Sequence, residues 1–356
     1  MSTSLSFFKN RRVLITGDTG FKGSWLSLWL DLLGAKITGY ALPPKNRGDL
    51  FNRLQLHRRI QHVNGDIRDR THLHKVFTHF RPEIVFHLAA QSLVRLSYAD
   101  PTYTVETNVG GSANLLECVR QSPSVRALVY ITSDKCYFNK EWPWAYREND
   151  ELGGRDPYSA SKAAAELLFA SYRSSFFDAR KTLGAASVRA GNVIGGGDWA
   201  ADRIVPDCIR ALQKRRPIHL RNPSAIRPWQ HVLDPLYGYL RIAERLYSKP
   251  HDFSGSWNFG PSIHSARTVQ DVASKIIACW GTGTIRHVPQ KKAPHESQTL
   301  LLNCDKAQRQ LGWTPLWDVD RSITETADWY REVNAGSPAV EITERQIATY
   351  MDSRDD

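Results

Sequence analysis

A glycine-rich turn near the start of the chain constrains the fold more than any other feature of the sequence. The string TGDTGFKG, residues 16–23, directly follows the apolar residues 13–15 and opens an amphipathic stretch over residues 25–33. A strand, a glycine turn and a helix N-terminus in this order form a phosphate cradle, because the unpaired amide groups of the first helical turn face the anion. The pattern predicts a dinucleotide-binding unit.

Each glycine of this turn has its own expected role. Gly17 permits the tight turn, Gly20 lets the backbone approach a pyrophosphate, and Gly23 allows the helix to pack closely on the strand. We therefore expect the whole loop to contact the cofactor, through Gly17, Asp18, Thr19, Gly20, Phe21, Lys22 and Gly23.

Short apolar runs alternate with helical stretches through the first half of the chain. The runs cover residues 13–16, 36–40, 61–63, 84–88, 128–132 and 186–189. Such alternation predicts an α/β fold, a Rossmann-type doubly wound parallel sheet with helices on both faces. We expect two of these helices at residues 102–121 and 157–178, and a short terminal helix from residue 341.

The regular pattern ends after Arg189, where glycines and prolines become frequent. We therefore expect residues 1–190 to form the dinucleotide-binding domain, with a segment near 225–255 that returns to it. Residues 191–356 are expected to form mainly a smaller, mixed α/β substrate domain.

The composition argues against several other classes of protein. The formal net charge is +11, but the basic residues are spread along the chain, which does not favour a nucleic-acid partner. No apolar run approaches the roughly 20 residues of a membrane span, so we expect a soluble, cytoplasmic protein. The five cysteines are scattered and never occur as Cys-x-x-Cys, which indicates neither a disulfide framework nor a metal site.

A second constellation carries acid–base chemistry. Tyr158 and Lys162 stand four residues apart at the start of an expected helix, so both side chains lie on one face. The ammonium of Lys162 is expected to favour the phenolate and to lower the pKa of Tyr158 towards neutrality. Asp134 and Lys135 follow Ser133 at the end of an expected strand, and they offer a further acid and base.

Several motifs together resemble the extended short-chain dehydrogenase/reductase family, from residue 13 to about residue 315. They are TGDTGFKG, GDIRD, HLAAQ, TNVGGSANLLE, YITSDKCY, YSASK, RAGNVIGGGDW and LGWTP. Within that family, GFKGSWL, TSDKCYFNKEW and RPWQHVLDPLYGYL most resemble the dehydratases that act on CDP-glucose. The resemblance implies an NAD-dependent lyase that converts CDP-glucose to CDP-4-keto-6-deoxyglucose and water, an early step towards the dideoxy sugars of bacterial O-antigens.

The resemblance also implies a set of site residues. The catalytic residues would be Ser133, Asp134, Lys135, Tyr158 and Lys162. Beyond the glycine turn, the cofactor would contact Asp66, Ile67, Leu88, Ala89, Ala90, Gln91, Asn108, Tyr158, Lys162 and Arg189. The substrate would contact Asn192, Arg203 and Arg227, the two arginines being suited to its diphosphate.

The expected mechanism assigns one role to each catalytic group. Tyr158 removes the proton of the sugar's 4-hydroxyl, and Ser133 hydrogen-bonds the same oxygen. Lys135, as a neutral amine, then takes the proton of carbon 5, while Asp134, as a neutral acid, protonates the departing 6-hydroxyl. Burial favours both neutral forms, but a direct ion pair between Asp134 and Lys135 would oppose them. A charged Lys135 would instead stabilise the enolate.

One departure from the usual pattern affects the cofactor. NAD enzymes of this fold usually carry an acidic residue after the second strand, but here the chain continues as Leu42-Pro43-Pro44-Lys45. Lys45 or Arg47 is a possible partner for the 2′-phosphate of NADP. We favour NAD because the catalytic cycle regenerates it.

Two competing functions remain open, and the oligomeric state is inferred from the resemblance alone. The nearer competitor is another nucleotide-sugar dehydratase or an epimerase, against which Lys135 argues. The farther is a noncatalytic dinucleotide sensor or RNA-binding relative, against which the intact Tyr158 and Lys162 argue. By resemblance we expect a homodimer, or a higher homo-oligomer, that pairs helices around residues 105–119 and 163–177.

Overall fold

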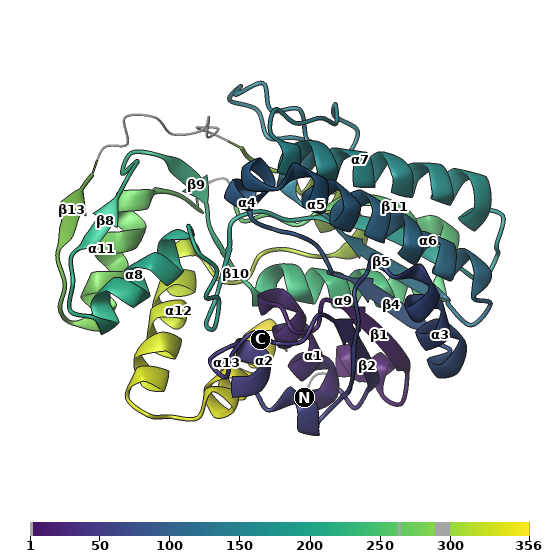
Figure 1. Cartoon of the computed structure of the whole chain (residues 1–356), viewed down its shortest axis with the longest axis horizontal. Coiled ribbons are helices and arrows are strands. Elements are labelled where there is room, and N and C mark those ends of the chain that lie inside the picture. Colours follow the sequence, from purple (N-terminus) through teal and green to yellow (C-terminus); the bar gives the residue numbers. More distant parts are fainter. Residues whose placement is uncertain (1–2, 263–264, 289–299, 356) are drawn as a thin grey trace.

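The computed structural model describes residues 3–262, 265–288 and 300–355, and its main body is a seven-stranded sheet (Figure 1). Every neighbouring pair of strands in it is parallel. The order across the sheet is β11-β6-β5-β4-β1-β2-β3. The strands are β1 (Arg12–Thr16), β2 (Lys36–Ala41), β3 (Gln61–Asn64), β4 (Ile84–His87), β5 (Ala127–Ile131), β6 (Gly184–Arg189) and β11 (Gly255–Asn258).

The strand order reverses at β1. The chain builds β2 and β3 on one side of β1 and then crosses to build β4, β5 and β6 on the other. Connections that leave in opposite directions open a crevice at the carboxyl ends of the strands. The predicted doubly wound sheet is thus confirmed, and all six expected strands are present. The seventh strand, β11, was not predicted.

Helices cover both faces of the sheet, because successive residues of its strands point to opposite faces and both sets are largely apolar. Val13 and Ile15 of β1 pack into the core that contains α1 (Phe21–Leu32) and α9 (Leu233–Ser248). Leu14 packs into the opposite core, whose helices are α3 (Arg70–Phe80), α6 (Gly111–Gln121) and α7 (Pro157–Tyr172). A strand buried on both faces reads as a continuous apolar run, as the sequence showed.

Two expected helices are interrupted. The helix predicted over residues 102–121 consists of α5 (Pro101–Val105), a π-helical turn η3 (Glu106–Gly110) and α6. The helix predicted over residues 157–178 is α7 followed by a second π-helical turn, η5 (Arg173–Phe177). A π turn is only one turn long and continues the helix, so the sequence pattern does not separate it from an α-helix.

The rest of the chain forms a smaller group of helices and two-stranded sheets beside the carboxyl edge of the main sheet (Figure 1). Its elements are β7 (Val193–Ile194), α8 (Ile204–Gln213), β8 (Ile218–Leu220), β9 (Ile226–Pro228), β10 (Gln230–His231), β12 (Ala266–Thr268), α11 (Val269–Trp280), β13 (Ile285–His287), η7 (Ala307–Leu311) and α12 (Val319–Asn334). The last helix, α13 (Ala339–Asp355), starts close to the expected residue and folds back against α1.

Short segments complete the connections of the main body. They are η1 (Thr3–Phe8), α2 (Leu50–Arg53), η2 (Leu56–Arg58), α4 (Val94–Ala99), η4 (Asp134–Cys136) and α10 (Pro250–Phe253). Among the described residues, no helix is long and apolar enough to span a membrane.

Candidate active site

A cavity of about 860 Å³ lies between the carboxyl edge of the sheet and the smaller group. This volume is at the upper end of the roughly 300–1,000 Å³ typical of ligand sites. Its lining begins at the glycine turn after β1, continues past the ends of β4, β5 and β6, and ends at β8 and β9. The cavity is therefore long enough to bring two ligands together at the point where the strand order reverses.

The glycine turn is packed so tightly that two of its glycines admit no side chain. A Cβ atom on Gly17, whose φ is +81°, would stand 2.7 Å from the backbone nitrogen of Ala89. A Cβ atom on Gly23 would stand 2.0 Å from the carbonyl oxygen of Gly17. Helix α1 follows with Gly20 as its N-cap, and no side chain caps it. Its first amide groups are thus available to an anion in the cavity, as a dinucleotide pyrophosphate requires.

Asp18 differs from its expected role, because its side chain does not line the cavity. The carboxylate is fully buried and pairs with the His62 ring at 2.6 Å. It lies against β2, where a Cβ atom on Gly39 would stand 2.1 Å from Asp18 Oδ2. The cradle at this position is backbone only. Thr19, Gly20, Phe21, Lys22 and Gly23 do line the cavity, with Gly17.

The end of the cavity beside β2 and β3 is lined by Leu42, Asp66 and Ile67. The carboxylate of Asp66 pairs with Arg68 at 2.7 Å, and this hydrogen bond lowers the pKa of Asp66. Lys45 and Arg47 are not among the described residues that line the cavity. The two cations that would favour a 2′-phosphate therefore do not contribute to its wall.

Leu88, Ala89 and Ala90 line the cavity after β4, but Gln91 and Asn108 do not. These two side chains support the wall from behind. Asn108 Oδ1 accepts a 2.8 Å hydrogen bond from the backbone of Gln91, and Asn108 Nδ2 donates to Gln91 O at 3.0 Å and to Ser161 Oγ at 2.9 Å. Because Ser161 precedes Lys162, Asn108 fixes the segment after β4 to helix α7.

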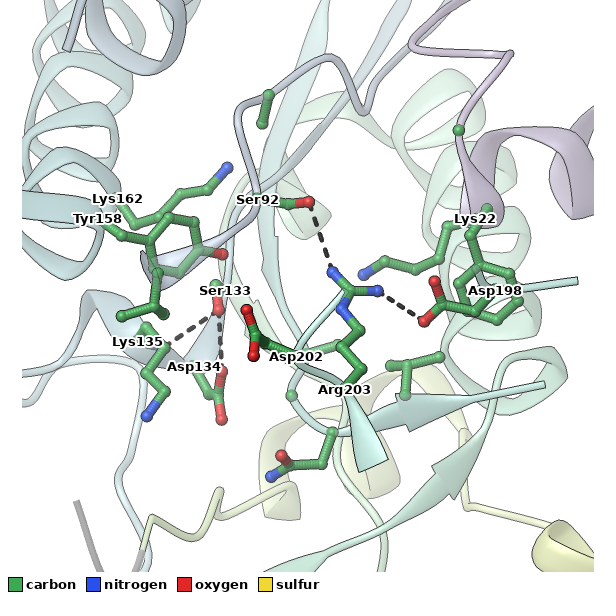
Figure 2. Close-up of a pocket in the computed structure, with 18 of the residues that line it drawn as sticks. Lys22, Ser92, Ser133, Asp134, Lys135, Tyr158, Lys162, Asp198, Asp202 and Arg203 are labelled. Carbon is green, nitrogen blue, oxygen red and sulfur yellow. Dashed lines mark hydrogen bonds and ion pairs between the residues drawn. The ribbon is translucent and has the colours of Figure 1, made fainter. Parts of the chain in front are cut away.

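The five expected catalytic side chains meet at one wall of the cavity (Figure 2). Ser133, Asp134 and Lys135 come from the end of β5, and Tyr158 and Lys162 point into the cavity from α7. Ser133 Oγ donates to Asp134 Oδ1 at 2.9 Å and accepts from the Lys135 backbone at 3.2 Å. The Tyr158 side chain lies beside Ser133 at this wall.

The start of helix α7 explains why Tyr158 is held firmly. Asp156 caps the helix by accepting from the Ser159 backbone at 2.9 Å, and Pro157 occupies the first turn. The Tyr158 backbone donates to Ser97 Oγ at 3.1 Å. Tyr158 and Lys162 are then one helical turn apart on the same face.

Gly191 holds the opposite side of the catalytic cluster. A Cβ atom at this residue would stand 2.0 Å from Asp134 Oδ2, so the carboxylate occupies space that any other residue would fill. Asp134 is 5% exposed. Among the described residues, Asp134 and Lys135 form no ion pair with each other.

The electrostatics differ from the expectation that Lys162 keeps Tyr158 ionised. Burial raises the pKa of Tyr158 to about 12, and burial lowers the pKa of Lys162 to about 8. The expected lowering of the Tyr158 pKa is therefore wrong for the protein alone, because loss of hydration outweighs the nearby cations. Burial also lowers the pKa of Lys22 to about 8, helped by repulsion from Lys162 and Arg203. A cavity that crowds cations in this way is suited to an anionic ligand.

The expected substrate residues Asn192, Arg203 and Arg227 all line the cavity. Arg203 pairs with Asp198 at 2.8 Å and donates to Ser92 Oγ at 3.4 Å (Figure 2). Arg189 instead turns away from the cavity and forms a buried ion pair with Glu166 at 2.7 Å.

Sequence reasoning missed several lining residues: Ser92, Arg155, Asp198, Asp202, Arg221 and Asn222. Most lie in loops without periodicity, so no pattern placed them. Among the described residues, no cluster of three histidine, cysteine or acidic side chains is arranged to hold a metal ion.

Comparison with protein families gives one matching model, GDP-mannose 4,6 dehydratase, over residues 14–326. The chain is 47% identical over 350 residues to a CDP-glucose 4,6-dehydratase from Salmonella typhimurium, covering 97% of this chain and 98% of that protein. It is 30% identical to a CDP-paratose 2-epimerase from Salmonella typhi, covering 89% of this chain and 98% of that protein.

Solved structures share the fold. The UDP-glucose 4-epimerase of Thermus thermophilus, in complex with NAD, has a TM-score of 0.77 and 26% identity, covering 90% of this chain and 99% of that one. The dTDP-glucose 4,6-dehydratase of Bacillus anthracis, in complex with NAD, has a TM-score of 0.74 and 22% identity, covering 90% and 97%. The second likeness is one of fold alone.

Proposed function

The chain belongs to the GDP-mannose 4,6 dehydratase family of extended short-chain dehydrogenases, and we propose that it is an NAD-dependent CDP-glucose 4,6-dehydratase. It is a hydro-lyase that converts CDP-glucose to CDP-4-keto-6-deoxyglucose and water. The observation that carries this function is the 47% identity, over nearly the whole chain, to an enzyme of that activity. The cavity supports it, because acid, base and cradle are all present at one edge of the sheet.

The cofactor fits the residues present. The uncapped N-terminus of α1 and the side-chain-free surface of Gly17 and Gly20 would hold the pyrophosphate, and Asp66 and Ile67 would contact the adenosine. NAD, when bound, supplies the oxidant that takes two electrons from carbon 4 of the sugar and returns them at carbon 6. No net redox change results, and the sugar loses one water.

Tyr158 is the proposed base for the 4-hydroxyl. With a pKa of about 12 it holds its proton in the protein alone, so it needs added positive charge before it can act. Lys162 on the same helix face would supply part of that charge, and Ser133, beside Tyr158, would hydrogen-bond the sugar oxygen that loses the proton (Figure 2). Loss of this proton, together with loss of the hydride of carbon 4 to the oxidant, would leave a ketone at carbon 4, and that ketone makes the proton on carbon 5 acidic.

Lys135 and Asp134 are the proposed groups for the loss of water. Lys135 lies beside Asp134 at the cavity wall (Figure 2). As a neutral amine it would accept the proton of carbon 5, and as an ammonium it would instead stabilise the enolate. Asp134, almost fully buried, protonates the departing 6-hydroxyl, so the bond from carbon 6 to oxygen breaks as water forms.

The substrate diphosphate is assigned to Arg203 and Arg227, and the sugar side to Asn192. Arg203 already pairs with Asp198, so a phosphate would compete with that carboxylate or share the guanidinium with it. The remaining N–H groups of the Arg203 guanidinium and the amine of Lys22 would then balance the negative charge of the diphosphate.

We propose a homodimer formed by helices α5, α6 and α7. Several large apolar side chains near these helices are exposed: Leu96, Tyr98, Val105, Leu167 and Phe176. A monomer rarely exposes apolar side chains in such a group without an interaction to cover them. We also propose a cytoplasmic location, in line with the five free cysteines, because reducing compartments keep thiols unpaired.

The division into a dinucleotide-binding domain of residues 1–190 and a substrate domain of residues 191–356 also stays a proposal. Helix α9 and strand β11 belong to the main sheet body, in keeping with a returning segment near 225–255. Helix α13 packs on α1, so the end of the chain would stiffen the first domain.

The test is turnover of CDP-glucose, dTDP-glucose and GDP-mannose, each with catalytic NAD, followed by alkaline absorbance of the keto sugar and by the mass loss of one water. We expect turnover of CDP-glucose alone, and loss of it in Lys135→Glu. Lys140→Glu is the matched control, because this substitution makes the same change of charge in the same segment. Lys140 pairs with Glu151 at the surface and not with the catalytic cluster. Bound NAD without water loss from any sugar would refute the dehydratase function.

A further inference from the structure

A buried polar network behind the catalytic wall is not used by the mechanism above. Glu166 and Arg189 form an ion pair at 2.7 Å, and their side chains are 1% and 2% exposed. Glu166 stands on α7 one turn after Lys162 and two turns after Tyr158, on the same helix face. The network therefore begins directly behind the base.

The carboxylate of Glu166 accepts hydrogen bonds from three side chains, those of Ser187, Thr132 and Arg189. Ser187 of β6 donates its hydroxyl at 2.8 Å, and Thr132, the residue after β5, donates its hydroxyl to the other carboxylate oxygen. Arg189 continues the network to Ser256 of β11 at 3.1 Å. The Glu166 carboxylate thus ties the catalytic helix directly to β6 and to the end of β5, and indirectly, through Arg189, to β11.

The network meets the catalytic loop at both ends. Thr132 is joined by a peptide bond to Ser133, the first residue of the Ser133–Asp134–Lys135 cluster. Arg189 lies two residues before Gly191, against which the Asp134 carboxylate rests. Arg189 also donates to the hydroxyl of Tyr137 at 2.7 Å, just beyond the cluster.

A buried ion pair is a poor way to gain stability, because removing two charges from water offsets most of their attraction. Its directional hydrogen bonds do fix the relative positions of the elements that carry them. Here those elements are the helix with the base and the strand end with the acid.

We propose that the Glu166–Arg189 pair, acting through the Thr132 hydroxyl, is a positioning unit that sets the Ser133–Asp134–Lys135 cluster against Tyr158 and Lys162. The chemistry needs this alignment because one sugar must meet both groups in the same cycle. A misplacement of about 1 Å is enough to cost on the order of 100-fold in rate. The proposal rests on the proposed dehydratase function and names a residue of that site, Thr132, which acts through others.

The test compares Thr132→Val with Ser187→Ala. Both variants remove one buried hydroxyl that donates to the Glu166 carboxylate, but only Thr132 adjoins the catalytic cluster. We expect Thr132→Val to lower kcat about 10- to 100-fold with KM within a factor of about three. Ser187→Ala should keep wild-type kcat. The thermal midpoints of Ser187→Ala and Thr132→Val should fall by similar amounts, because each variant removes one buried hydroxyl. Thr132→Ser, which keeps the donor, should restore most of kcat.

Crystal structures of both variants give a readout that does not depend on turnover. In Thr132→Val we expect residues 133–135 to shift relative to Tyr158, and in Ser187→Ala we expect no shift. Equal kcat in the two variants, or an unmoved loop in Thr132→Val, overturns the positioning role. Wild-type enzyme that fails to dehydrate CDP-glucose refutes the proposed function instead, and the loop positions in the two crystal structures still decide the positioning role.

Discussion

Gly191→Ala is expected to slow dehydration about 100-fold while leaving the fold intact. The alanine methyl would stand 2.0 Å from Asp134 Oδ2, and ordinary contact begins at 3.4 Å, so the carboxylate must move by about 1.4 Å. Gly191 lies outside the left-handed backbone region, so alanine meets no backbone strain there. The added methyl group should therefore displace the Asp134 carboxylate, the proposed acid, without disturbing the backbone.

The magnitude follows from that displacement. A shift of about 1 Å in a reacting group costs roughly 100-fold in rate, which corresponds to about 2.7 kcal/mol in the activation barrier. Asp134 cannot turn aside without losing its 2.9 Å bond to Ser133 or meeting buried neighbours. We expect the loss in kcat rather than in KM, since Arg203 and Arg227, the residues proposed to contact the diphosphate, lie elsewhere in the cavity.

The assay is steady-state formation of the 4-keto-6-deoxy sugar, with thermal unfolding measured beside it. Gly110→Ala is the matched control, because its methyl would meet no atom within 4 Å and its backbone is already helical. That control should keep wild-type kcat and gain about 0.5–1 kcal/mol of stability. A Gly191→Ala enzyme with kcat within threefold of wild type would refute the assignment of Asp134 as an acid held in place by Gly191.

Three further predictions concern single groups. Tyr158→Phe should lower kcat by about 10²- to 10⁴-fold, because the proposed base is lost; normal turnover would exclude Tyr158 as the base. Because burial lowers the pKa of Lys162 to about 8, kcat/KM should fall as the pH rises through that value and Lys162 loses its charge. Lys162→Arg should reduce this decline, and the part that remains should come from Lys22, whose pKa burial also lowers to about 8. Burial raises the pKa of Asp234 from 3.8 to about 6, so the folded state keeps a proton that the unfolded state releases, and the free energy of unfolding should fall as the pH rises between these values. Asp234→Asn should flatten that slope in thermal melts; an unchanged slope would assign it to another group.

Much of the fold was predictable because it depends on short-range patterns. Most of the six expected strands are largely apolar runs bounded by turns, the polar edge strand β3 being the exception, and their alternation with helices fixes a parallel sheet. Strand β11 escaped prediction because it has only four residues, two of them polar, and becomes a strand by pairing with β6. The π turns η3 and η5 escaped prediction because each is a single turn that continues a neighbouring α-helix.

The site was predictable where the motif itself carries the chemistry. Ser133, Asp134, Lys135, Tyr158 and Lys162 come from two segments about 25 residues apart, each at a strand or helix end, and topology brings such ends to one edge of the sheet. Four expected cofactor contacts do not line the cavity, because each side chain or its backbone bonds to a residue distant in the sequence: Asp18, Gln91, Asn108 and Arg189. Such partners leave no local signal.

The sequence alone determined the phosphate cradle, the order of strands and helices, and the types of residue available as acid and base, because each depends on neighbours a few positions apart. Only the tertiary structure decided how those groups are charged and where they point. Burial of Tyr158 and Lys162, and the contact of Asp134 with Gly191, depend on atoms from segments that are distant in the sequence. These atoms come together only in the folded chain.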